Sequence, residues 1–283
     1  MAKMDGQPCP VPRRIGLVHK KSSPDAKACA EAVGRYLAQR GVAVLSDEEA
    51  VAREADLLLV LGGDGTLIHA ARLLEGRSAP ILGVNMGGLG FLTEVTQAEL
   101  YEAIDRVLAG GAFVAERMKL RVHVHRGREG DAKIFDAEVL NDAVIAKGTL
   151  SRMAEFEATA GDVFVTSYKA DGIIVATPTG STAYALAANG PILYPSMRGF
   201  VLAPICPHTL TQRPIVLPDD QTVNLRLVSE SEVYLTLDGQ TGLELVPQDR
   251  VQIKQSHNRV LLVRNPRLDY FGILRAKLKW GQR

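Results

Sequence analysis

The chain lacks the motifs by which many phosphate-binding and hydrolytic enzymes are recognised. It contains no G-x-x-x-x-G-K-[ST] sequence, so it is not a P-loop protein, and no G-x-G-x-x-G sequence follows a predicted strand. It also has no G-x-S-x-G elbow and no serine, histidine and aspartate in a triad order. Acyl-transfer hydrolysis is therefore disfavoured.

Cysteine and charge of one sign are also scarce. The three cysteines, Cys9, Cys29 and Cys206, form no C-x-x-C pair, which argues against a zinc site or a disulfide framework and predicts reduced thiols. The formal net charge of +1 gives no signature of a nucleic-acid or anionic-membrane partner. The first twelve residues lack the apolar core of a signal peptide, and no apolar run approaches membrane-spanning length. We therefore expect a cytoplasmic protein with no nucleic-acid and no membrane partner.

Strands and helices alternate in the first part of the chain. Its 283 residues, 46% of them hydrophobic, are enough for one large or two modest domains. Pattern and capping predict strands at 14–19, 57–61 and 80–85, and helices at 24–40, 66–75 and 96–110. The helix that begins at Pro24 places Ala26, Ala30, Val33 and Leu37 on one face. This alternation predicts a parallel sheet with right-handed crossovers.

The pattern changes after about Arg117. Apolar residues then recur with period two, as in Val223, Leu225 and Leu227, which predicts β-strands. In the same region His123 and His125 alternate with valines, which predicts a solvated face for the two histidines. We therefore predict an α/β fold with an N-terminal doubly wound parallel-sheet domain (1–115), a C-terminal all-β domain (116–265) and a closing helical segment (266–283) that returns to the first domain.

A glycine-rich turn follows the second predicted strand. Residues 56–67 read D-L-L-L-V-L-G-G-D-G-T-L, a buried strand that runs into a turn with Asp64 at its centre and then into a helix. Glycines let the backbone approach a phosphate closely, and a helix N-terminus offers free N–H groups to an anion. An ordinary tight turn, in which aspartate forms local hydrogen bonds, explains the same residues equally well.

Three further stretches carry polar or small residues next to predicted strands. Residues 177–182 read T-P-T-G-S-T and precede Tyr184, whose ring could stack on an adenine. Asn141 and Asp142 follow the strand 134–140 and could bind ribose hydroxyls, although surface turns often contain the same pair. Asp238 and Gly239 form a typical hairpin turn. Each stretch alone is compatible with an ordinary structural role.

Taken together and in order, these stretches resemble the motif series of bacterial NAD kinases, from about Ile15 to the C-terminal region. The matching segments are 62–66, 84–92, 140–142, 171–172, 177–184, 207–210, 213–214 and 238–240. Lipid kinases and phosphofructokinases carry a similar glycine turn, but the ordered set, above all T-P-T-G-S-T-A-Y, is specific. The resemblance implies transfer of the γ-phosphoryl group of ATP to the 2′-hydroxyl of the adenosine ribose of NAD, which forms NADP.

The resemblance also implies roles for individual residues. Asp64 matches the family's proton acceptor, and the phosphate loop comprises Gly62, Gly63, Gly65 and Thr66. The residues that it implies for substrate binding are Asp64, Gly65, His69, Asn141, Asp142, Arg152, Lys169, Asp171, Thr182, Ala183, Tyr184, Ala185, Leu186, Ala187 and Gln240. It implies a divalent cation, with Mg²⁺ expected, and a homodimer or homotetramer. It identifies no metal-coordinating residue, and it leaves open whether polyphosphate replaces ATP and whether NADH replaces NAD.

Two other functions remain as alternatives. A lipid kinase of the diacylglycerol type shares the glycine turn, but it is opposed by the T-P-T-G-S-T-A-Y stretch and by the lack of a basic or amphipathic membrane-binding segment. A non-catalytic dinucleotide-binding module would predict a degraded acceptor position, whereas Asp64 is present.

Overall fold

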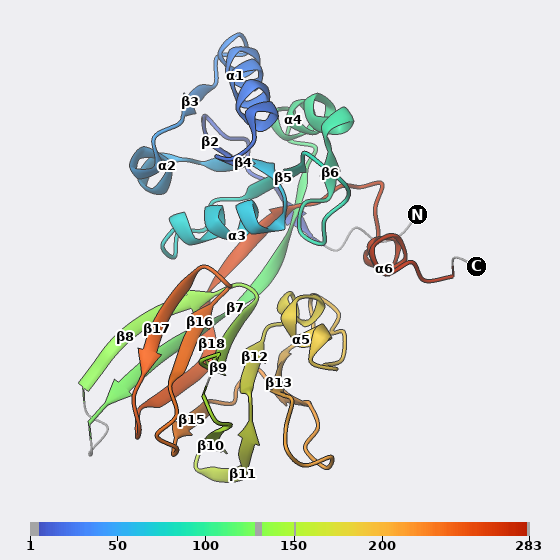
Figure 1. The fold of residues 1–283 in the computed structure, drawn as a ribbon. Coiled ribbons are helices and arrows are strands. Elements are labelled where there is room, and N and C mark those ends of the chain that lie inside the picture. The colour runs from blue at the N-terminus through green and yellow to red at the C-terminus, as the bar shows by residue number, and fades with distance from the viewer. Residues whose placement is uncertain (1–5, 128–131, 150, 282–283) are drawn as a thin grey trace. The chain divides into compact units, whose positions relative to one another are not determined.

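The computed structural model describes residues 6–127, 132–149 and 151–281, which fall into two compact units (Figure 1). The first unit comprises the chain up to Glu116 and the segment from Arg259 onward, and the second comprises Arg117–Asn258. The chain thus returns to the first unit at Arg259, earlier than the predicted residue 266. This is because the long strand β18 (Arg250–Val263) contributes residues to both units, as does β7 (Phe113–Arg126).

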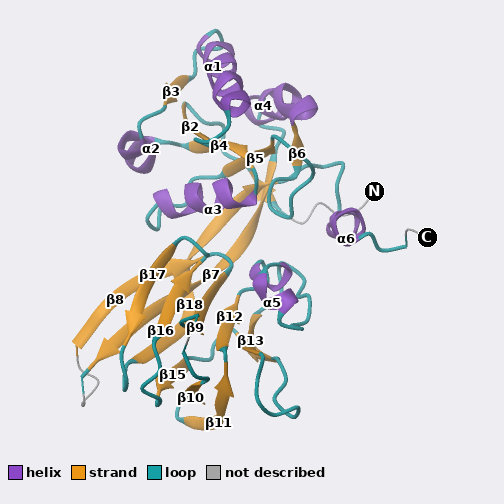
Figure 2. Ribbon diagram, viewed as in Figure 1, coloured by secondary structure: helices purple, strands orange, loops and turns teal. Residues whose placement is uncertain are grey.

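Most helices belong to the first unit, whereas strands dominate the second (Figure 2). In addition to its parts of β7 and β18, the first unit contains β1 (Gln7–Pro8), β2 (Arg14–His19), α1 (Pro24–Ala38), β3 (Ala43–Leu45), α2 (Glu48–Glu54), β4 (Leu57–Gly62), α3 (Asp64–Leu73), β5 (Ile81–Asn85), β6 (Val95–Thr96), the 3₁₀ helix η1 (Gln97–Glu99), α4 (Leu100–Leu108) and α6 (Tyr270–Leu278). None of the described helices, in either unit, combines the length and apolarity that crossing a membrane requires.

The sheet of the first unit is parallel and carries helices on both faces. Its strand order is β3-β2-β4-β5, continued by the end of β18. Neighbouring residues of β2 contact opposite layers: Leu17 packs against α1, whereas the backbone of Gly16 lies against Val51 of α2. Because successive residues of a strand point to opposite faces, α1 and α2 lie on different sides of the sheet. The predicted doubly wound arrangement is confirmed.

Helix α1 follows its sequence signals closely. The Ser23 hydroxyl accepts a hydrogen bond from the backbone N–H of Ala26, and Pro24 occupies the first helical turn. All four residues of the predicted apolar face are buried, and Gly41 after the helix has a φ of +74°.

Several features of the first unit differ from the prediction. Helix α3 begins at Asp64 and not at Thr66, because Gly63 is already its N-cap. Strand β3 and helix α2 were not predicted. The N-cap of α2 is Asp47, whose carboxylate accepts hydrogen bonds from two backbone N–H groups, but only Val51 is buried, so the helix has no apolar stripe in the sequence.

The second unit is built almost entirely from antiparallel strands. Besides its parts of β7 and β18, it contains β8 (Ala132–Val139), β9 (Asp142–Lys147), β10 (Ala154–Ala160), β11 (Val163–Ala170), β12 (Gly172–Ala176), η2 (Gly180–Thr182), α5 (Tyr184–Ala187), β13 (Gly199–Ile205), β14 (Ile215–Pro218), β15 (Val223–Leu227), β16 (Val233–Leu237) and β17 (Thr241–Leu245). One sheet has the order β14-β13-β12-β9-β16-β17, and β11-β10-β15-β18 continues with β7 and β8 in the other. The antiparallel C-terminal domain is thus confirmed.

Strand β12 is buried along its whole length, because both faces of its sheet are covered. Ile173 and Val175 contribute to the main core of the unit, whereas Ile174 and Ala176 pack with Ala185 of α5. A strand covered on both sides reads as a continuous apolar run, here G-I-I-V-A. After β12 the chain forms the 3₁₀ helix η2 and the single turn α5.

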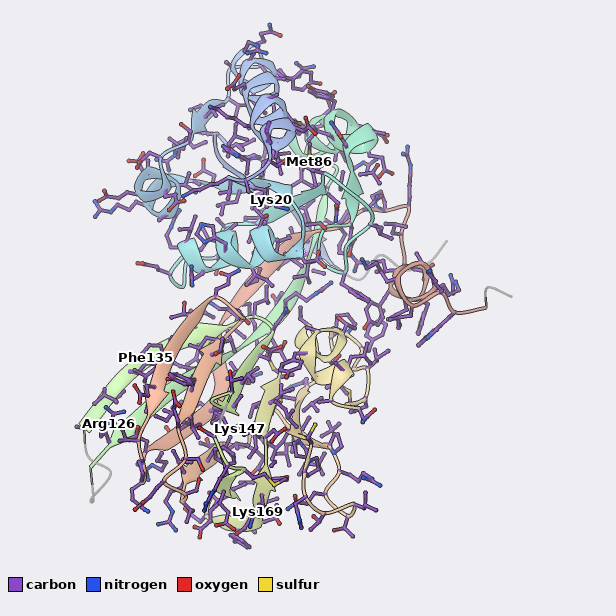
Figure 3. All side chains as sticks on the ribbon, viewed as in Figure 1. Lys20, Met86, Arg126, Phe135, Lys147 and Lys169 are labelled. Carbon is purple, nitrogen blue, oxygen red and sulfur yellow. The ribbon has the colours of Figure 1, made fainter. Side chains whose placement is uncertain are left out.

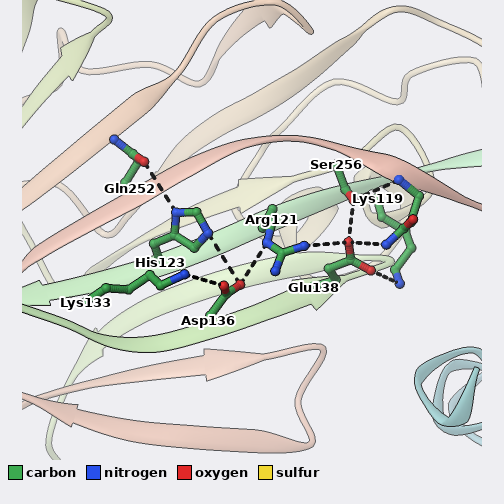
Figure 4. Close-up of polar contacts among 9 residues, drawn as sticks. Lys119, Arg121, His123, Lys133, Asp136, Glu138, Gln252 and Ser256 are labelled. Atoms are coloured by element: carbon green, nitrogen blue, oxygen red, sulfur yellow. Dashed lines mark hydrogen bonds and ion pairs between the residues drawn. The ribbon is translucent and has the colours of Figure 1, made fainter. Parts of the chain in front are cut away.

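His123 lies in a polar network on β7 and β8, contrary to the predicted solvated face (Figure 4). Its side chain is only 13% exposed, with Nε2 3.4 Å from Asp136 Oδ1 and Nδ1 3.4 Å from Gln252 Oε1. The Arg121 guanidinium, 2.8 Å from Asp136, holds the pKa of that carboxyl well below its usual range. Period two identified the two faces correctly, but polar partners on neighbouring strands cover the histidine.

Candidate functional site

The glycine turn of the first unit lies between β4 and α3, at the carboxyl edge of the parallel sheet. A Cβ on Gly62 would lie 2.4 Å from the Thr66 hydroxyl, so a side chain at this position would displace the first turn of α3. A Cβ on Gly63 or Gly65 would meet no atom within 4 Å. The backbone of the turn is therefore open to a ligand on the side where these two glycines lie.

Asp64, the first residue of α3, points its carboxylate at a second loop rather than at its own turn. Oδ2 accepts the backbone N–H of Phe91 at 2.8 Å. Oδ1 accepts the N–H groups of Leu92 and Thr93, both at 3.1 Å, and the Thr93 hydroxyl at 3.0 Å. Asp64 thus links the glycine turn to the loop 86–93. An ionised carboxylate, which only accepts hydrogen bonds, suits this set of four donors.

The loop 86–93 follows β5 and is shaped around this carboxylate. Asn85, the last residue of β5, accepts the Gly87 N–H at 2.9 Å and donates to the Thr93 hydroxyl at 2.7 Å. A Cβ on Gly90 would lie 2.2 Å from both Asp64 Oδ1 and Thr93 Oγ1. A glycine is therefore required at this position for Asp64 and Thr93 to meet.

Other residues near this edge of the sheet include a lysine and two histidines. Lys20 directly follows β2 and Met86 directly follows β5, and Figure 3 labels both. His69 lies on α3, with Nε2 3.5 Å from Glu48 and Nδ1 3.4 Å from Arg72. His19, at the end of β2, has a buried Nδ1 with no hydrogen-bond partner among the described residues. His69 is a predicted site residue, whereas His19 is not.

In the second unit, Asn141 and Asp142 lie where β8 leads into β9, and the turn after β16 holds them. The Asp238 carboxylate accepts the N–H groups of Leu140 at 2.9 Å, Asn141 at 2.7 Å and Asp142 at 3.1 Å. In return, the Asp238 N–H donates to the Asp142 carbonyl at 2.9 Å. Asp238 and Gly239 have φ values of +50° and +65°, as a tight Asp-Gly hairpin requires.

Two carboxyls are thereby buried in the same place. Burial and the charge of nearby Asp238 raise the pKa of Asp142 from its usual range to about 7. Burial also raises the pKa of Asp238, against the lowering effect of its three backbone donors. Ionisable groups with strongly shifted pKa values are concentrated at functional sites.

The T-P-T-G-S-T segment packs directly on Asn141. A Cβ on Gly180 would lie 2.1 Å from the Asn141 carbonyl oxygen, so only glycine fits. The Thr177 hydroxyl donates to the Leu140 carbonyl at 2.6 Å, and the Ser181 hydroxyl donates to the Pro178 carbonyl at 2.6 Å. The Thr177 bond holds the segment against the start of β9, and the Ser181 bond closes the turn within the segment.

Two side-chain atoms of this segment and of Asn141 remain without a hydrogen-bond partner in the described part of the chain. Asn141 Oδ1 and Thr179 Oγ1 are buried and have no hydrogen-bond partner among the described residues. Buried polar atoms are normally satisfied, so an acceptor and a hydroxyl without partners on two packed segments indicate a polar ligand. Thr179 was not among the predicted site residues, and nothing distinguishes it from its neighbours in the sequence.

The remaining predicted residues of this unit differ in exposure. Thr182 and Ala183 are half-buried, Ala185 is buried, Leu186 is half-buried and Ala187 is exposed. Tyr184 is 47% exposed at the start of α5, so its ring is available for stacking. Gln240 lies in the exposed turn after Asp238, and Arg152 is exposed in the segment before β10.

Lys169 and Asp171 lie at the end of β11 and just beyond it. Asp171 Oδ1 is 3.4 Å from the Lys147 ammonium, and the Lys169 side chain is exposed. Figure 3 labels both lysines. The Lys169 carbonyl accepts the His208 N–H at 2.9 Å, which ties the 206–214 loop to β11.

Comparison with known proteins identifies the family. The ATP-NAD kinase N-terminal domain matches residues 48–112, and the ATP-NAD kinase C-terminal domain matches residues 140–265. An NAD kinase of Geobacter metallireducens is 52% identical over 250 residues, covering 88% of this chain and 86% of the relative. An NAD kinase of Geotalea daltonii is 45% identical over 286 residues, covering 96% and 100%. The chain belongs to the NAD kinase family.

Solved structures agree on the fold. The yeast NADH kinase complexed with NADH has a TM-score of 0.86 at 23% identity, covering 98% of this chain and 89% of that one. The NAD kinase of Archaeoglobus fulgidus in complex with ATP has a TM-score of 0.73 at 24% identity, covering 94% and 98%. Membership of the NAD kinase family decides against a lipid kinase and against a non-catalytic binding module. The protein is an enzyme that phosphorylates NAD with ATP.

Proposed function

We propose that Asp64 is the proton acceptor for this reaction. The 2′-oxygen of the adenosine ribose attacks the γ-phosphorus of ATP, the bond from that phosphorus to ADP breaks, and the hydroxyl proton passes to the Asp64 carboxylate. The observation that carries the proposal is a carboxylate at the first residue of α3, flanked by two glycines with open space above them. In phosphoryl transfer, a positioned carboxylate commonly accepts the hydroxyl proton.

We assign the phosphate loop to Gly62, Gly63, Gly65 and Thr66. Because Gly63 and Gly65 have no side chain to separate a ligand from the backbone, phosphate oxygens can approach the N–H groups at the start of α3. His69, one turn further on, would contact the substrate from the same helix.

The second unit would bind the dinucleotide. The orphaned Asn141 Oδ1 and Thr179 Oγ1 would hydrogen-bond its polar groups, and Tyr184 would stack on the adenine. The proposed set of dinucleotide-binding residues is completed by Asp142, Asp171, Lys169, Arg152, Gln240 and the backbone of 182–187. The backbone of Asp142 is held in position by the Asp238 carboxylate.

The divalent cation of the reaction, with Mg²⁺ as the expected ion, would enter with the phosphates of ATP. Mg²⁺ in kinases is usually held by substrate phosphates, water and one or two carboxylates. Among the described residues, no group of three or more His, Cys, Asp or Glu side chains is arranged to hold a metal. When bound, the cation would neutralise charge on the transferred phosphoryl group.

We further propose that the enzyme works in the cytoplasm as a homodimer or homotetramer. The support for assembly is the edge strand β11, which among the described strands pairs with β10 alone and exposes Val163 and Phe164 by 70% and 59%. An apolar strand edge of this kind is usually covered in a folded protein.

Direct assay tests the proposal. Purified protein is incubated with NAD, Mg²⁺ and ATP, and NADP is quantified with an NADP-specific dehydrogenase. Parallel reactions replace ATP with inorganic polyphosphate, NAD with NADH, or NAD with a diacylglycerol dispersion. NADP formation that requires a phosphoryl donor supports the assignment. Phosphorylation of the lipid without phosphorylation of NAD would overturn it.

A further inference from the structure

A partly buried chain of side-chain hydrogen bonds ends at the carboxylate of Asp64. It runs from Asn85 Nδ2 to Thr93 Oγ1 at 2.7 Å and from Thr93 Oγ1 to Asp64 Oδ1 at 3.0 Å. Thr93 has no exposed surface, and Asn85 is the last residue of β5. All three residues belong to the first unit.

The direction of the chain follows from its donors. Asn85 Oδ1 accepts the Gly87 N–H at 2.9 Å, so the other end of the amide, the Nδ2 donor, faces Thr93. A hydroxyl has one proton to give. Because Thr93 Oγ1 accepts from Asn85, its own proton is committed to Asp64.

The two oxygens of Asp64 consequently differ. Oδ1 accepts three hydrogen bonds, from the Leu92 N–H, the Thr93 N–H and the Thr93 hydroxyl. Within the described part of the chain, Oδ2 accepts a single hydrogen bond, from the Phe91 N–H. A carboxylate oxygen offers about two lone-pair positions, so Oδ1 is saturated and Oδ2 retains capacity for another proton.

We propose that Thr93 and Asn85 are positioning residues that reserve Oδ2 of Asp64 as the atom that takes the ribose hydroxyl proton. The proposal rests on the role of Asp64 given above and specifies it. In the reaction the 2′-O–H bond breaks, the new O–P bond forms, ADP leaves, and the proton resides on Oδ2. The hydroxyl of Thr93 stabilises the negative charge on Oδ1 and keeps the carboxylate from rotating.

The charged groups on the elements around Asp64 are few. His69 and Arg72 lie on the same helix, where His69 contacts Glu48, and the Lys277 ammonium of α6 lies 5.7 Å over the Phe91 ring. No ion pair of Asp64 occurs within the described part of the chain. The donors of the loop 86–93, rather than an ion pair, therefore provide its local electrostatic environment.

The test is the pair Thr93→Val and Thr93→Ser. Valine keeps the shape of the side chain and removes the hydroxyl. We expect kcat to fall roughly 10- to 100-fold, as expected for the loss of a hydrogen bond to a charged group, with little change in the KM for NAD. The acidic limb of the kcat pH profile should move to higher pH, because the charged carboxylate loses a donor. Serine should recover most of the lost turnover.

Asn85→Asp is a second variant in case valine prevents folding. An aspartate at this position presents an acceptor to Thr93, which turns the hydroxyl proton away from Asp64. We expect the same loss in kcat and the same shift of the pH profile. Both substitutions remove the same hydrogen bond, from the Thr93 hydroxyl to Asp64. The loss of kcat in the double variant should therefore be less than the product of the two separate losses. Thr159→Val in the second unit, where the hydroxyl donates to the Gly161 carbonyl at 3.1 Å, is the control and should leave both readouts unchanged.

The outcomes separate the two proposals. If Thr93→Val has a normal kcat and an unshifted pH profile, with only a lower Tm, Thr93 has a structural role and the inference is overturned. A fully additive double variant would also overturn it. If Asp64→Asn itself retains turnover, the proton-acceptor assignment fails first. An inactive Asp64→Asn with a normal Thr93→Val would refute this inference alone.

Discussion

The Asp238 carboxylate accepts the backbone N–H of Asn141 at 2.7 Å, across 97 residues of sequence. Two further consecutive N–H groups, of Leu140 and Asp142, donate to the same carboxylate. Asp64 does the same in the first unit, where it accepts the N–H groups of three consecutive residues that begin at Phe91. In each unit, an aspartate in a tight turn thus fixes the backbone of a second loop, and the site residues lie on these paired segments.

Replacing Asp64 by asparagine should remove most turnover while sparing NAD binding. The amide oxygen can still accept the three donors of Oδ1, but the amide nitrogen that replaces Oδ2 cannot take a proton. Loss of a general base typically costs about 10²- to 10⁴-fold in rate. Steady-state NADP formation gives kcat, and calorimetry gives the Kd for NAD. A variant with near-wild-type kcat would contradict the proton-acceptor role.

Tyr184→Ala should raise the KM for NAD more than it lowers kcat. Stacking would hold the dinucleotide equally in the ground state and the transition state, so its loss affects binding rather than the chemical step. Because Tyr184 is 47% exposed, the substitution leaves no core cavity. Tyr184→Phe keeps the ring and serves as the matched control. An unchanged KM in the alanine variant, with an unchanged circular dichroism spectrum, would argue against stacking.

Gly180→Ala should damage both stability and NAD binding. The new Cβ would lie 2.1 Å from the Asn141 carbonyl oxygen, so the backbone of one segment must move. Overpacking of a buried position costs about 1–3 kcal/mol. Gly34→Ala on α1 is the control, because its Cβ has no neighbour closer than 3.8 Å and alanine favours a helix by roughly 0.5–1 kcal/mol. Equal stabilities of the two variants in urea unfolding would disprove the steric argument.

Asp142→Asn should stabilise the ligand-free enzyme, and increasingly so as the pH rises from about 4 to about 7. The folded-state pKa of Asp142 is raised to about 7, whereas an unfolded aspartate titrates near about 3.9. In this range the unfolded wild-type chain binds fewer protons at Asp142 than the folded one, so this group lowers stability as the pH rises. The asparagine variant lacks this penalty, and its advantage should grow by at most about 1.4 kcal/mol per pH unit.

Urea unfolding of wild-type and variant protein at about pH 5 and about pH 7 measures this difference. Asp162→Asn, in the exposed turn between β10 and β11, is the control for the loss of one carboxyl. A pH-independent difference for Asp142→Asn would show that burial does not keep this carboxyl protonated.

Dilution should weaken NAD binding if subunits assemble as proposed. Strand β11 carries Lys169, whose side chain is exposed and which Asp171 follows, so loss of a neighbouring subunit at this strand would uncover this part of the proposed dinucleotide site. Light scattering over a dilution series, run beside NAD titrations, tests the idea. A monomer at assay concentration with full activity would disprove it.

Much of the fold could be predicted from local signals. Ser23, Pro24 and Gly41 define the ends of α1, and its buried face follows from the 3.6-residue period. Strands such as β16, with Val233 and Leu235 buried and Tyr234 exposed, follow from period two. Helix α2 was missed because a seven-residue helix with one buried side chain has no periodic pattern to detect.

The candidate site could be predicted only in part. The order of the motifs identified the glycine turn, the Asn141–Asp142 pair and the T-P-T-G-S-T segment, and it identified the family. It did not identify Thr93 or Thr179, whose importance depends on atoms that neighbouring segments leave within reach. Likewise, the hairpin at Asp238 was predicted as a turn, but its three backbone acceptor contacts were not.

The sequence by itself determined most of the longer elements, the order of the motifs and hence the family, because helix periods, turn chemistry and glycine spacing act over a few residues. Only the tertiary structure decided which donors surround Asp64 and Asp238, that His123 is covered by Asp136 and Gln252, and that Asp142 titrates near neutral pH. These properties arise from hydrogen bonding and desolvation between segments that are distant in sequence. They are therefore set by packing rather than by local preference.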